Sequence, residues 1–201
     1  MKEFWNERFG MQEYVYGTAP NEYLKEIIAG IKPGKILFPA EGEGRNAVYA
    51  AQLGFEVDAF DYSEAGRQKA LALAELKAVS INYQIQDFDT WEPTPETYDV
   101  IALIYAHPPV GKRGLYHSKV LKALKPGGII ILEGFNKSQL GNKSGGPQVH
   151  EMLYSVDELK SDFQSLRDLE IYELQTELSE GDFHKGIAEV IRMTGFTFLG
   201  A

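Results

Sequence analysis

Two closely spaced glycines give the first indication of chemistry in this chain. Gly42 and Gly44 follow a short apolar run, residues 36–38, which is too short for a helix and suits a buried strand. A stretch with good helical character, residues 45–51, comes next. Glycine has no Cβ, so a ligand can approach the main chain of such a turn closely. Strand, glycine turn and helix N-terminus together predict a binding crevice of the nucleotide type.

A distant acid strengthens this prediction. Asp61 lies at the end of a second predicted strand, residues 55–60, where its carboxylate can accept hydrogen bonds from both hydroxyls of a ribose. With the spacing Gly42-x-Gly44-x-x-Ala47 it fits a dinucleotide fingerprint. The glycine spacing alone favours a purely structural turn from strand to helix. The acid shifts the interpretation toward a ligand that contains adenosine.

Composition limits the class of protein. The 201 residues predict one domain with a well-buried core. The absence of cysteine excludes disulfides, thiolate metal sites and a cysteine nucleophile. A net charge of −9 disfavours nucleic acid and anionic membranes as partners. Residues 1–7 carry acids and lack a signal-peptide core, and no apolar run approaches membrane-spanning length, so a cytoplasmic protein is expected.

The rest of the chain alternates between predicted strands and helices. Helices are expected over residues 4–9, 22–28, 63–77, 111–124 and 155–163, and further strands over residues 81–86, 98–105, 129–133, 169–178 and 186–194. This order predicts an α/β fold with a mostly parallel sheet and helices on both faces. The short join over residues 179–182 predicts that the last two strands pair antiparallel at the sheet edge. Residues 135–151 show no periodicity and are expected to form a lid or binding loop.

Five stretches, in order, resemble the motif set of class I S-adenosylmethionine (SAM)-dependent methyltransferases. They are ILFPAEGEGRNA, VDAFDYS, QDFD, YDVIALIY and LKPGGIIILE, and the last is the most specific. FWNERF, YVYGTAPN, GRNA, the GGP loop and EGDFHKGIAEVI further resemble the bacterial tellurite-resistance and thiopurine methyltransferase-like group.

This resemblance, which covers essentially the whole chain, implies a Rossmann-like class I methyltransferase fold. The single domain would span residues 1–201, with an N-terminal cap segment over residues 1–30 and a core over residues 35–201. It also implies SAM as the cofactor and a small-molecule acceptor: a thiol, a thiopurine-like ring or a chalcogen oxyanion.

The resemblance further implies which residues meet SAM. The glycine turn would contact the methionine and ribose, the acid after the second strand the ribose hydroxyls, and the residues after the third and fourth strands the adenine and the transferred methyl. With their neighbours, these positions are Ala40, Glu41, Gly42, Gly44, Asn46, Asp61, Tyr62, Ser63, Asp87, Phe88, Tyr105 and Ala106.

Two positions depart from the family pattern. Phe38 stands where an acid is usual, and Ala40, preceded by Pro39, stands where the first glycine is usual. Glu41 and Glu43 are candidates to supply negative charge near the ammonium group of the ligand instead.

Aromatic residues before the first strand are candidates to cover the cofactor. Trp5 and Tyr16, the latter in a loop with Gly17, can fold over the bound ligand and present ring faces to a cationic sulfonium. A packing role for Trp5 is equally compatible with the sequence.

Histidines are the candidate catalytic residues. His107 follows the strand of residues 98–105 and His184 opens the last strand, so either can act as a general base or contact an anion. His117 lies within a predicted helix and is expected to be structural. A metal site built from His107, His150 and His184 lacks a supporting spacing, so no metal is expected.

Two other functions remain compatible with parts of the sequence. A nicotinamide dehydrogenase would also use the glycine turn and Asp61, but LKPGG and the C-terminal antiparallel pair disfavour it. A non-catalytic SAM-binding or interaction protein is suggested by the departure at Phe38-Pro39-Ala40.

Overall fold

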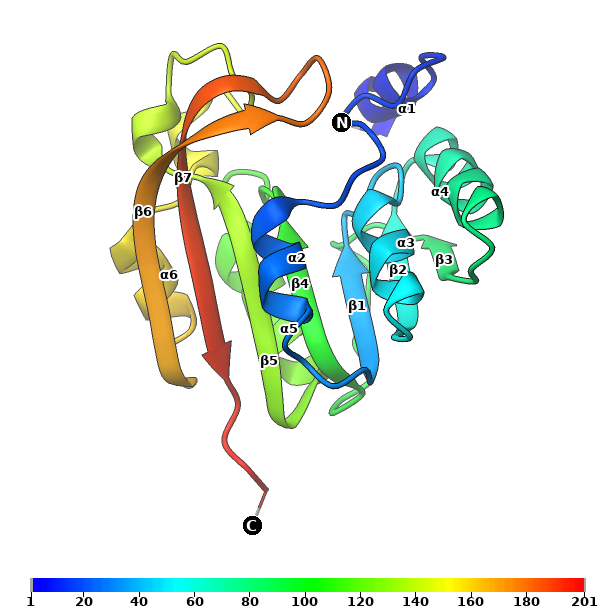
Figure 1. Ribbon diagram of the computed structural model, residues 1–201. Coiled ribbons are helices and arrows are strands. Elements are labelled where there is room, and N and C mark those ends of the chain that lie inside the picture. Colours follow the sequence, from blue (N-terminus) through cyan, green and yellow to red (C-terminus); the bar gives the residue numbers. More distant parts are fainter. Residues whose placement is uncertain (1, 201) are drawn as a thin grey trace.

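A computed structural model describes residues 2–200, so Met1 and Ala201, the two ends of the expected domain, lie outside the described residues. One sheet of seven strands forms its centre, in the order β3-β2-β1-β4-β5-β7-β6 (Figure 1). The strands are β1 (Lys35–Pro39), β2 (Glu56–Asp61), β3 (Asn82–Ile85), β4 (Tyr98–Ile104), β5 (Leu124–Phe135), β6 (Arg167–Ser179) and β7 (Lys185–Phe196).

Strand direction confirms the expected mostly parallel sheet. Strands β1 to β5 pair parallel to one another, and β7 pairs antiparallel with both β5 and β6. The sheet therefore has the Rossmann-like arrangement expected from the sequence. The chain builds outward from β1 through β2 to β3 and then returns to the other side of β1 as β4. Such a switch point opens a crevice at the carboxyl ends of the strands.

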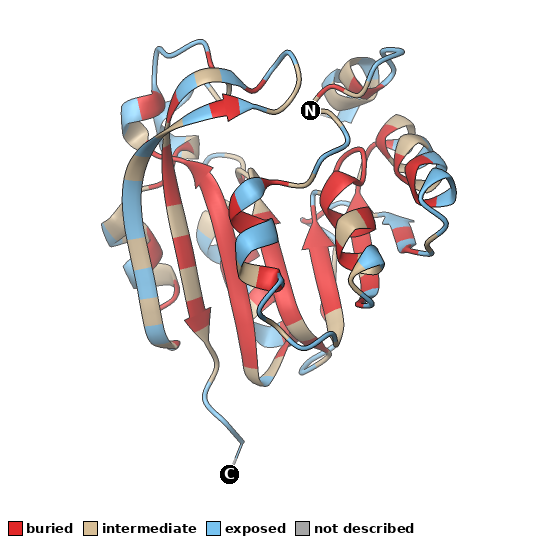
Figure 2. Cartoon of the chain, in the orientation of Figure 1, coloured by how far each residue is buried: buried red, intermediate tan, exposed pale blue. Residues whose placement is uncertain are grey.

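Helices cover both faces of the sheet. One face packs against α2 (Glu22–Ile28), α3 (Arg45–Gln52) and α4 (Glu64–Leu76), and the other against α5 (Arg113–Ala123) and α6 (Val156–Asp162). Successive residues of the central strands alternate between the two clusters, as the twofold repeat of a strand requires. The central strands are consequently buried along most of their length (Figure 2). No helix within residues 2–200 is long and apolar enough to span a bilayer.

Some boundaries differ from those expected. β5 begins at Leu124 rather than residue 129, because Tyr98 already pairs with Leu124 across an irregularity in the β4–β5 register. The segment expected to be an irregular loop contains two short 3₁₀ turns, Lys137–Gln139 and His150–Met152.

α1 (Lys2–Phe9) lies above the carboxyl ends of β1 and β2, near the tip of the β6–β7 hairpin (Figure 1).

Ala40, after β1, carries the main backbone strain of the glycine turn. Its φ of 54° lies in the left-handed region, where the side chain of an L-residue crowds the backbone. A glycine, which the methyltransferase pattern that this sequence resembles has at that position, would adopt this conformation without such crowding.

We expect Ala40→Gly to raise the free energy of unfolding by up to about 1 kcal/mol, because relief of the left-handed strain outweighs the added freedom of the unfolded chain. Ala50→Gly, in the middle of α3, is the control and should lower that free energy by more than about 1 kcal/mol, because it also removes a fully buried methyl group. Chemical denaturation measures both. An Ala40→Gly loss as large as that of the control would contradict the strain.

Candidate active site

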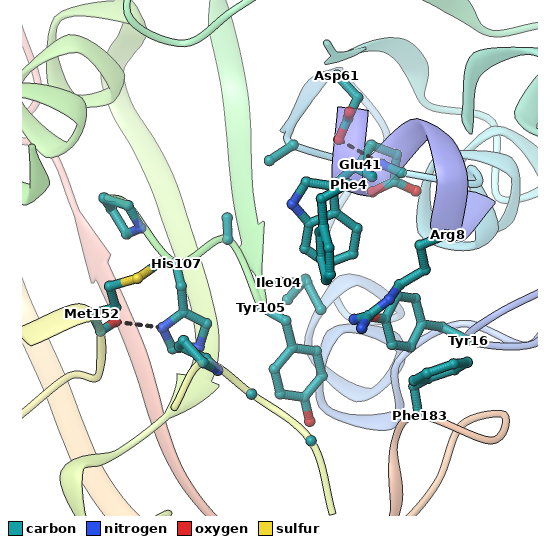
Figure 3. A pocket seen from close by; sticks show the side chains of 18 of the residues that line it. Phe4, Arg8, Tyr16, Glu41, Asp61, Ile104, Tyr105, His107, Met152 and Phe183 are labelled. Carbon is teal, nitrogen blue, oxygen red and sulfur yellow. Dashed lines mark hydrogen bonds between the residues drawn. The ribbon is translucent and has the colours of Figure 1, made fainter. Parts of the chain in front are cut away.

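A cavity of about 1110 Å³ opens at the carboxyl ends of the parallel strands. Most of the residues expected from the sequence line it: Trp5, Tyr16, Ala40, Glu41, Gly42, Asn46, Asp61, Tyr62, Asp87, Phe88, Tyr105, Ala106, His107 and His184. Gly17, Gly44 and Ser63 do not line it. The glycine turn and the residues after β2, β3 and β4 form its floor, and α1 and the tip of the β6–β7 hairpin contribute its cover (Figure 3).

Asp61 is held in place by the backbone around it. Its Oδ1 accepts a hydrogen bond from the Ser63 N–H at 2.8 Å, and its Oδ2 accepts one from the Gly42 N–H at 3.3 Å. Burial raises the pKa of Asp61 to about 6. The Ser63 hydroxyl caps α4 and donates to Asn6 Oδ1 at 2.7 Å, so Ser63 anchors α1 instead of facing the cavity.

Glu41 is the second acid of the floor. Its Oε1 accepts hydrogen bonds from the N–H groups of Asn46 at 3.0 Å and Ala47 at 2.8 Å, in the first turn of α3. Gly44 at the N-cap supplies no side chain, so Glu41 performs that role. Desolvation raises the pKa of Glu41 to about 7.

Glu43 points elsewhere. Its carboxylate accepts from the Val15 N–H at 2.8 Å and pairs with Lys69 at 2.7 Å, behind the cavity wall. Of the two acids considered for the ammonium group of the ligand, the structure therefore brings only Glu41 to the cavity.

A buried carboxylate, Glu133, binds side chains from three elements behind the Tyr105 wall of the cavity. Glu133, at the end of β5, is 1% exposed and accepts hydrogen bonds from Asn21 Nδ2 at 2.6 Å, Tyr105 OH at 2.9 Å and Arg192 Nε at 2.5 Å. Tyr105 adopts a left-handed φ of 53°, and its N–H donates to the Glu133 carbonyl at 2.7 Å. These bonds hold the Tyr105 ring against the cavity.

His184 lies just before β7 rather than within it, and is 5% exposed. Its Nδ1 lies 3.2 Å from Glu180 Oε2, and the same oxygen pairs with Arg45 at 3.0 Å. The imidazole packs against the rings of Tyr16 and Tyr105, with centroid distances of 4.4 and 4.5 Å. The structure thus places this candidate base in the cavity wall.

His107 also lines the cavity, but the backbone occupies both of its ring nitrogens. Nδ1–H donates to the Met152 carbonyl at 2.8 Å, and Nε2 accepts from the Phe135 N–H at 3.0 Å (Figure 3). A ring held in this way has no free nitrogen for a nucleophile. These bonds join the segment after β4 to β5 and to the 3₁₀ turn at Met152, and they disfavour the proton-transfer role that was expected of His107.

The other two histidines lie away from the cavity. His117 is buried in α5 and lies 2.8 Å from Asp162 Oδ2, whereas His150 is exposed. Within residues 2–200, no group of three or more His, Cys, Asp or Glu side chains is arranged to hold a metal ion.

Several residues that shape the site were not expected from the sequence. Phe9 packs on the glycine turn so closely that a Cβ on Gly42 would lie 2.9 Å from its ring. The Arg8 guanidinium lies over the rings of Phe4 and Phe183 at 4.3 and 4.6 Å, joining α1 to the β6–β7 tip. The only signal for Glu133 was an acid that ends a run of four apolar residues.

We expect His107→Gln to change how stability depends on pH. Desolvation lowers the pKa of His107 to about 4, below its usual 6.5, so the unfolded chain takes up the proton first as the pH falls. The wild-type stability contributed by the neutral ring is present above about pH 6.5 and is lost toward about pH 4. The stability advantage of wild type over the variant should shrink by on the order of 1–3 kcal/mol across that interval.

Chemical denaturation at several pH values measures this difference. His150→Gln is the control, since its ring is exposed and has no part in the backbone contacts. A wild-type advantage over His107→Gln that stays constant with pH would show that His107 is not held neutral.

Comparisons with known proteins agree with this geometry. Residues 36–128 match the family model described as a methyltransferase domain. The ubiquinone biosynthesis O-methyltransferase of Rickettsia akari is 28% identical over 181 residues, which cover 87% of this chain and 72% of that protein.

Solved structures share the fold at low sequence identity. TehB from Haemophilus influenzae superposes with a TM-score of 0.74 at 18% identity, over 98% of this chain and 66% of that one. An N-methyltransferase from Haemonchus contortus, solved with S-adenosylhomocysteine, gives a TM-score of 0.70 at 15% identity, over 97% of this chain and 56% of that one. The matched domain and the Rickettsia akari relative support a SAM-dependent methyltransferase, and the solved structures show that the fold is shared.

Proposed function

We propose that this protein transfers a methyl group from SAM to a small molecule bound beside it in the same cavity. The observation that carries the proposal is the cavity at the switch point of the sheet, which both acidic and aromatic side chains line. Its volume of about 1110 Å³ exceeds the roughly 300–1,000 Å³ of a pocket for one drug-sized ligand. We propose that a cavity of this size holds SAM and an acceptor together.

The acids of the cavity fit a cationic cofactor. Glu41 lines the cavity and uses its Oε1 to accept from the backbone of α3, so its carboxylate is the proposed partner of the SAM ammonium group. Asp61 is the proposed acceptor for the ribose hydroxyls, and Asp87 for the adenine amino group. Tyr105 and Ala106 would lie beside the methionine and the methyl group.

SAM supplies a methyl group on a cationic sulfur, and the chain supplies position and exclusion of water. Trp5, Phe9 and Tyr16 form a connected aromatic cover, with centroid distances of 5.1 Å between the first pair and 6.4 Å between the second. Their ring faces suit a nearby positive charge. We assign residues 1–30 the role of a cap on the core.

Thiols, thiopurine-like rings and chalcogen oxyanions are the first acceptors to test, on the strength of the sequence resemblance. SAM binding measured by calorimetry, followed by formation of S-adenosylhomocysteine with each acceptor, tests the proposal. Binding without turnover on any acceptor would favour a non-catalytic SAM-binding protein. Absence of SAM binding would overturn the proposal.

Asp61→Asn should weaken SAM binding by about 1–3 kcal/mol, because it removes charge-assisted hydrogen bonds to the ribose. Calorimetry should therefore show a dissociation constant higher by roughly 5- to 150-fold. Asp58→Asn is the matched control in the same strand, since Asp58 bonds Asn82 and Tyr98 away from this cavity. Equal affinities for both variants would remove Asp61 from the ribose site.

Deleting residues 1–12 should weaken SAM binding and leave the core folded. The deletion removes α1 but keeps the Val15 N–H bond to Glu43, so the segment that follows stays anchored. Trp5→Ala tests the same cover by a point change, with exposed Met11→Ala as its control. Circular dichroism reports the fold and calorimetry the affinity. Unchanged affinity in both the deletion and Trp5→Ala would show that α1 only packs against the core.

A further inference from the structure

Glu180 and His184, in the turn between β6 and β7, form a close pair that packing of the cavity cover does not require. Glu180 Oε2 lies 3.2 Å from His184 Nδ1. Contacts with His184 and Arg45 hold the pKa of Glu180 down at about 2, so this carboxylate is ionised and can only accept. The proton of a neutral His184 ring therefore lies on Nδ1, and the lone pair lies on Nε2.

The free nitrogen faces the cavity. Within residues 2–200, His117 Nε2 is the only buried side-chain nitrogen or oxygen that lacks a hydrogen-bond partner. His184 Nε2 forms no hydrogen bond with those residues either, so it must be open to the cavity that His184 lines. It is thereby available to a bound molecule.

The carboxylate behind the ring is itself held on two sides. Arg45 donates to Glu180 Oε2 at 3.0 Å, and Asn21 Nδ2 donates to Oε1 at 3.1 Å. Glu180 is thus fixed to α3 and to the start of α2, and the ring to Glu180. Such a chain of contacts fixes the tautomer and orientation of an imidazole.

Other charged and titratable groups surround the ring. Burial is the largest influence and lowers the pKa of His184; Arg45 also lowers it, whereas Glu180 and Glu133 favour protonation. The remaining neighbours, Tyr16 and Tyr105, are phenols with raised pKa values that stay neutral. The ring is consequently unprotonated at neutral pH.

We propose that Glu180 is a positioning residue for His184, and that the acceptor is an aromatic ring whose hydroxyl gives its proton to His184 Nε2 during methyl transfer. This inference rests on the proposed function. As the oxygen–hydrogen bond breaks, the acceptor oxygen forms a bond to the methyl carbon. The carbon–sulfur bond of SAM breaks with its electron pair on sulfur, which leaves neutral S-adenosylhomocysteine. The imidazolium then releases its proton to water.

A neutral histidine base favours an acceptor that must lose a proton before or during methyl transfer. A phenolic hydroxyl ionises near pH 10 and needs a base at neutral pH, whereas a thiol ionises near 8.5 and an oxyanion has no proton to lose. The rings of Tyr16, Tyr105 and Phe135 surround His184, with centroid distances of 4.4, 4.5 and 5.3 Å. Flat aromatic surfaces of this kind suit a flat acceptor.

The test uses the full-length protein with SAM and three phenols: phenol, 4-nitrophenol and pentafluorophenol, whose hydroxyls ionise at successively lower pH. With phenol, His184→Asn should lower turnover by about 10²–10⁴-fold, and Glu180→Gln by about tenfold or more. With pentafluorophenol, already ionised at neutral pH, both losses should nearly vanish. Glu177→Gln, an exposed carboxylate on β6, is the matched control and should retain wild-type rates.

The remaining outcomes decide against the inference. A Glu180→Gln loss equal for all three phenols would mean that Glu180 only holds the hairpin. SAM binding without methylation of any phenol would overturn the acceptor class and leave the proposed function standing, whereas loss of SAM binding in wild type would overturn both. Nitrogen NMR of His184 gives a readout apart from activity: a proton on Nε2 instead of Nδ1 in the wild-type protein would contradict the pair.

Discussion

The rest of the site depends on one buried carboxylate, Glu133. A charge taken out of water near the middle of a sheet is costly unless several donors surround it. Its partners come from three places: Asn21 at the start of α2, Tyr105 after β4 and Arg192 on β7. Removing any one of them would leave a buried charge with too few donors, so the three elements are held in fixed positions relative to one another. The left-handed backbone of Tyr105 persists because these bonds over-determine it.

The same network ties the floor of the cavity to its cover. Asn21 bonds both Glu133 and Glu180, and Glu180 reaches Arg45 and His184. The acids of this network and those of the cavity floor behave differently. Glu180 sits beside a guanidinium and keeps a low pKa, whereas Asp61 and Glu41 have raised pKa values because burial outweighs the hydrogen bonds they receive. A cation bound beside Asp61 and Glu41 would favour their ionised forms. SAM, which carries a sulfonium and an ammonium group, is such a cation.

Much of the fold and part of the site could be predicted from the sequence. Strand and helix periodicity indicated the order of elements, and Asp61 ends β2 where the crevice opens. The helix expected over residues 155–163 begins at a capping box formed by Ser155 and Glu158. The hydrogen bonds of His107 could not be predicted, for a physical reason. Its position after β4 was visible, but the Met152 carbonyl and the Phe135 N–H that use its ring nitrogens belong to segments 45 and 28 residues away.

The sequence by itself determined the features that depend on neighbouring residues: the alternation of strands and helices, the glycine turn, the helix caps and the acid after β2. These follow from backbone conformation and side-chain periodicity within about a dozen residues. Tertiary structure decided which polar groups became partners. Asn21 and Glu133 are 112 residues apart, and Arg45 and Glu180 are 135 apart. No local pattern specifies such pairs, because they form only when the order and direction of the strands bring distant carboxyl ends to one edge of the sheet.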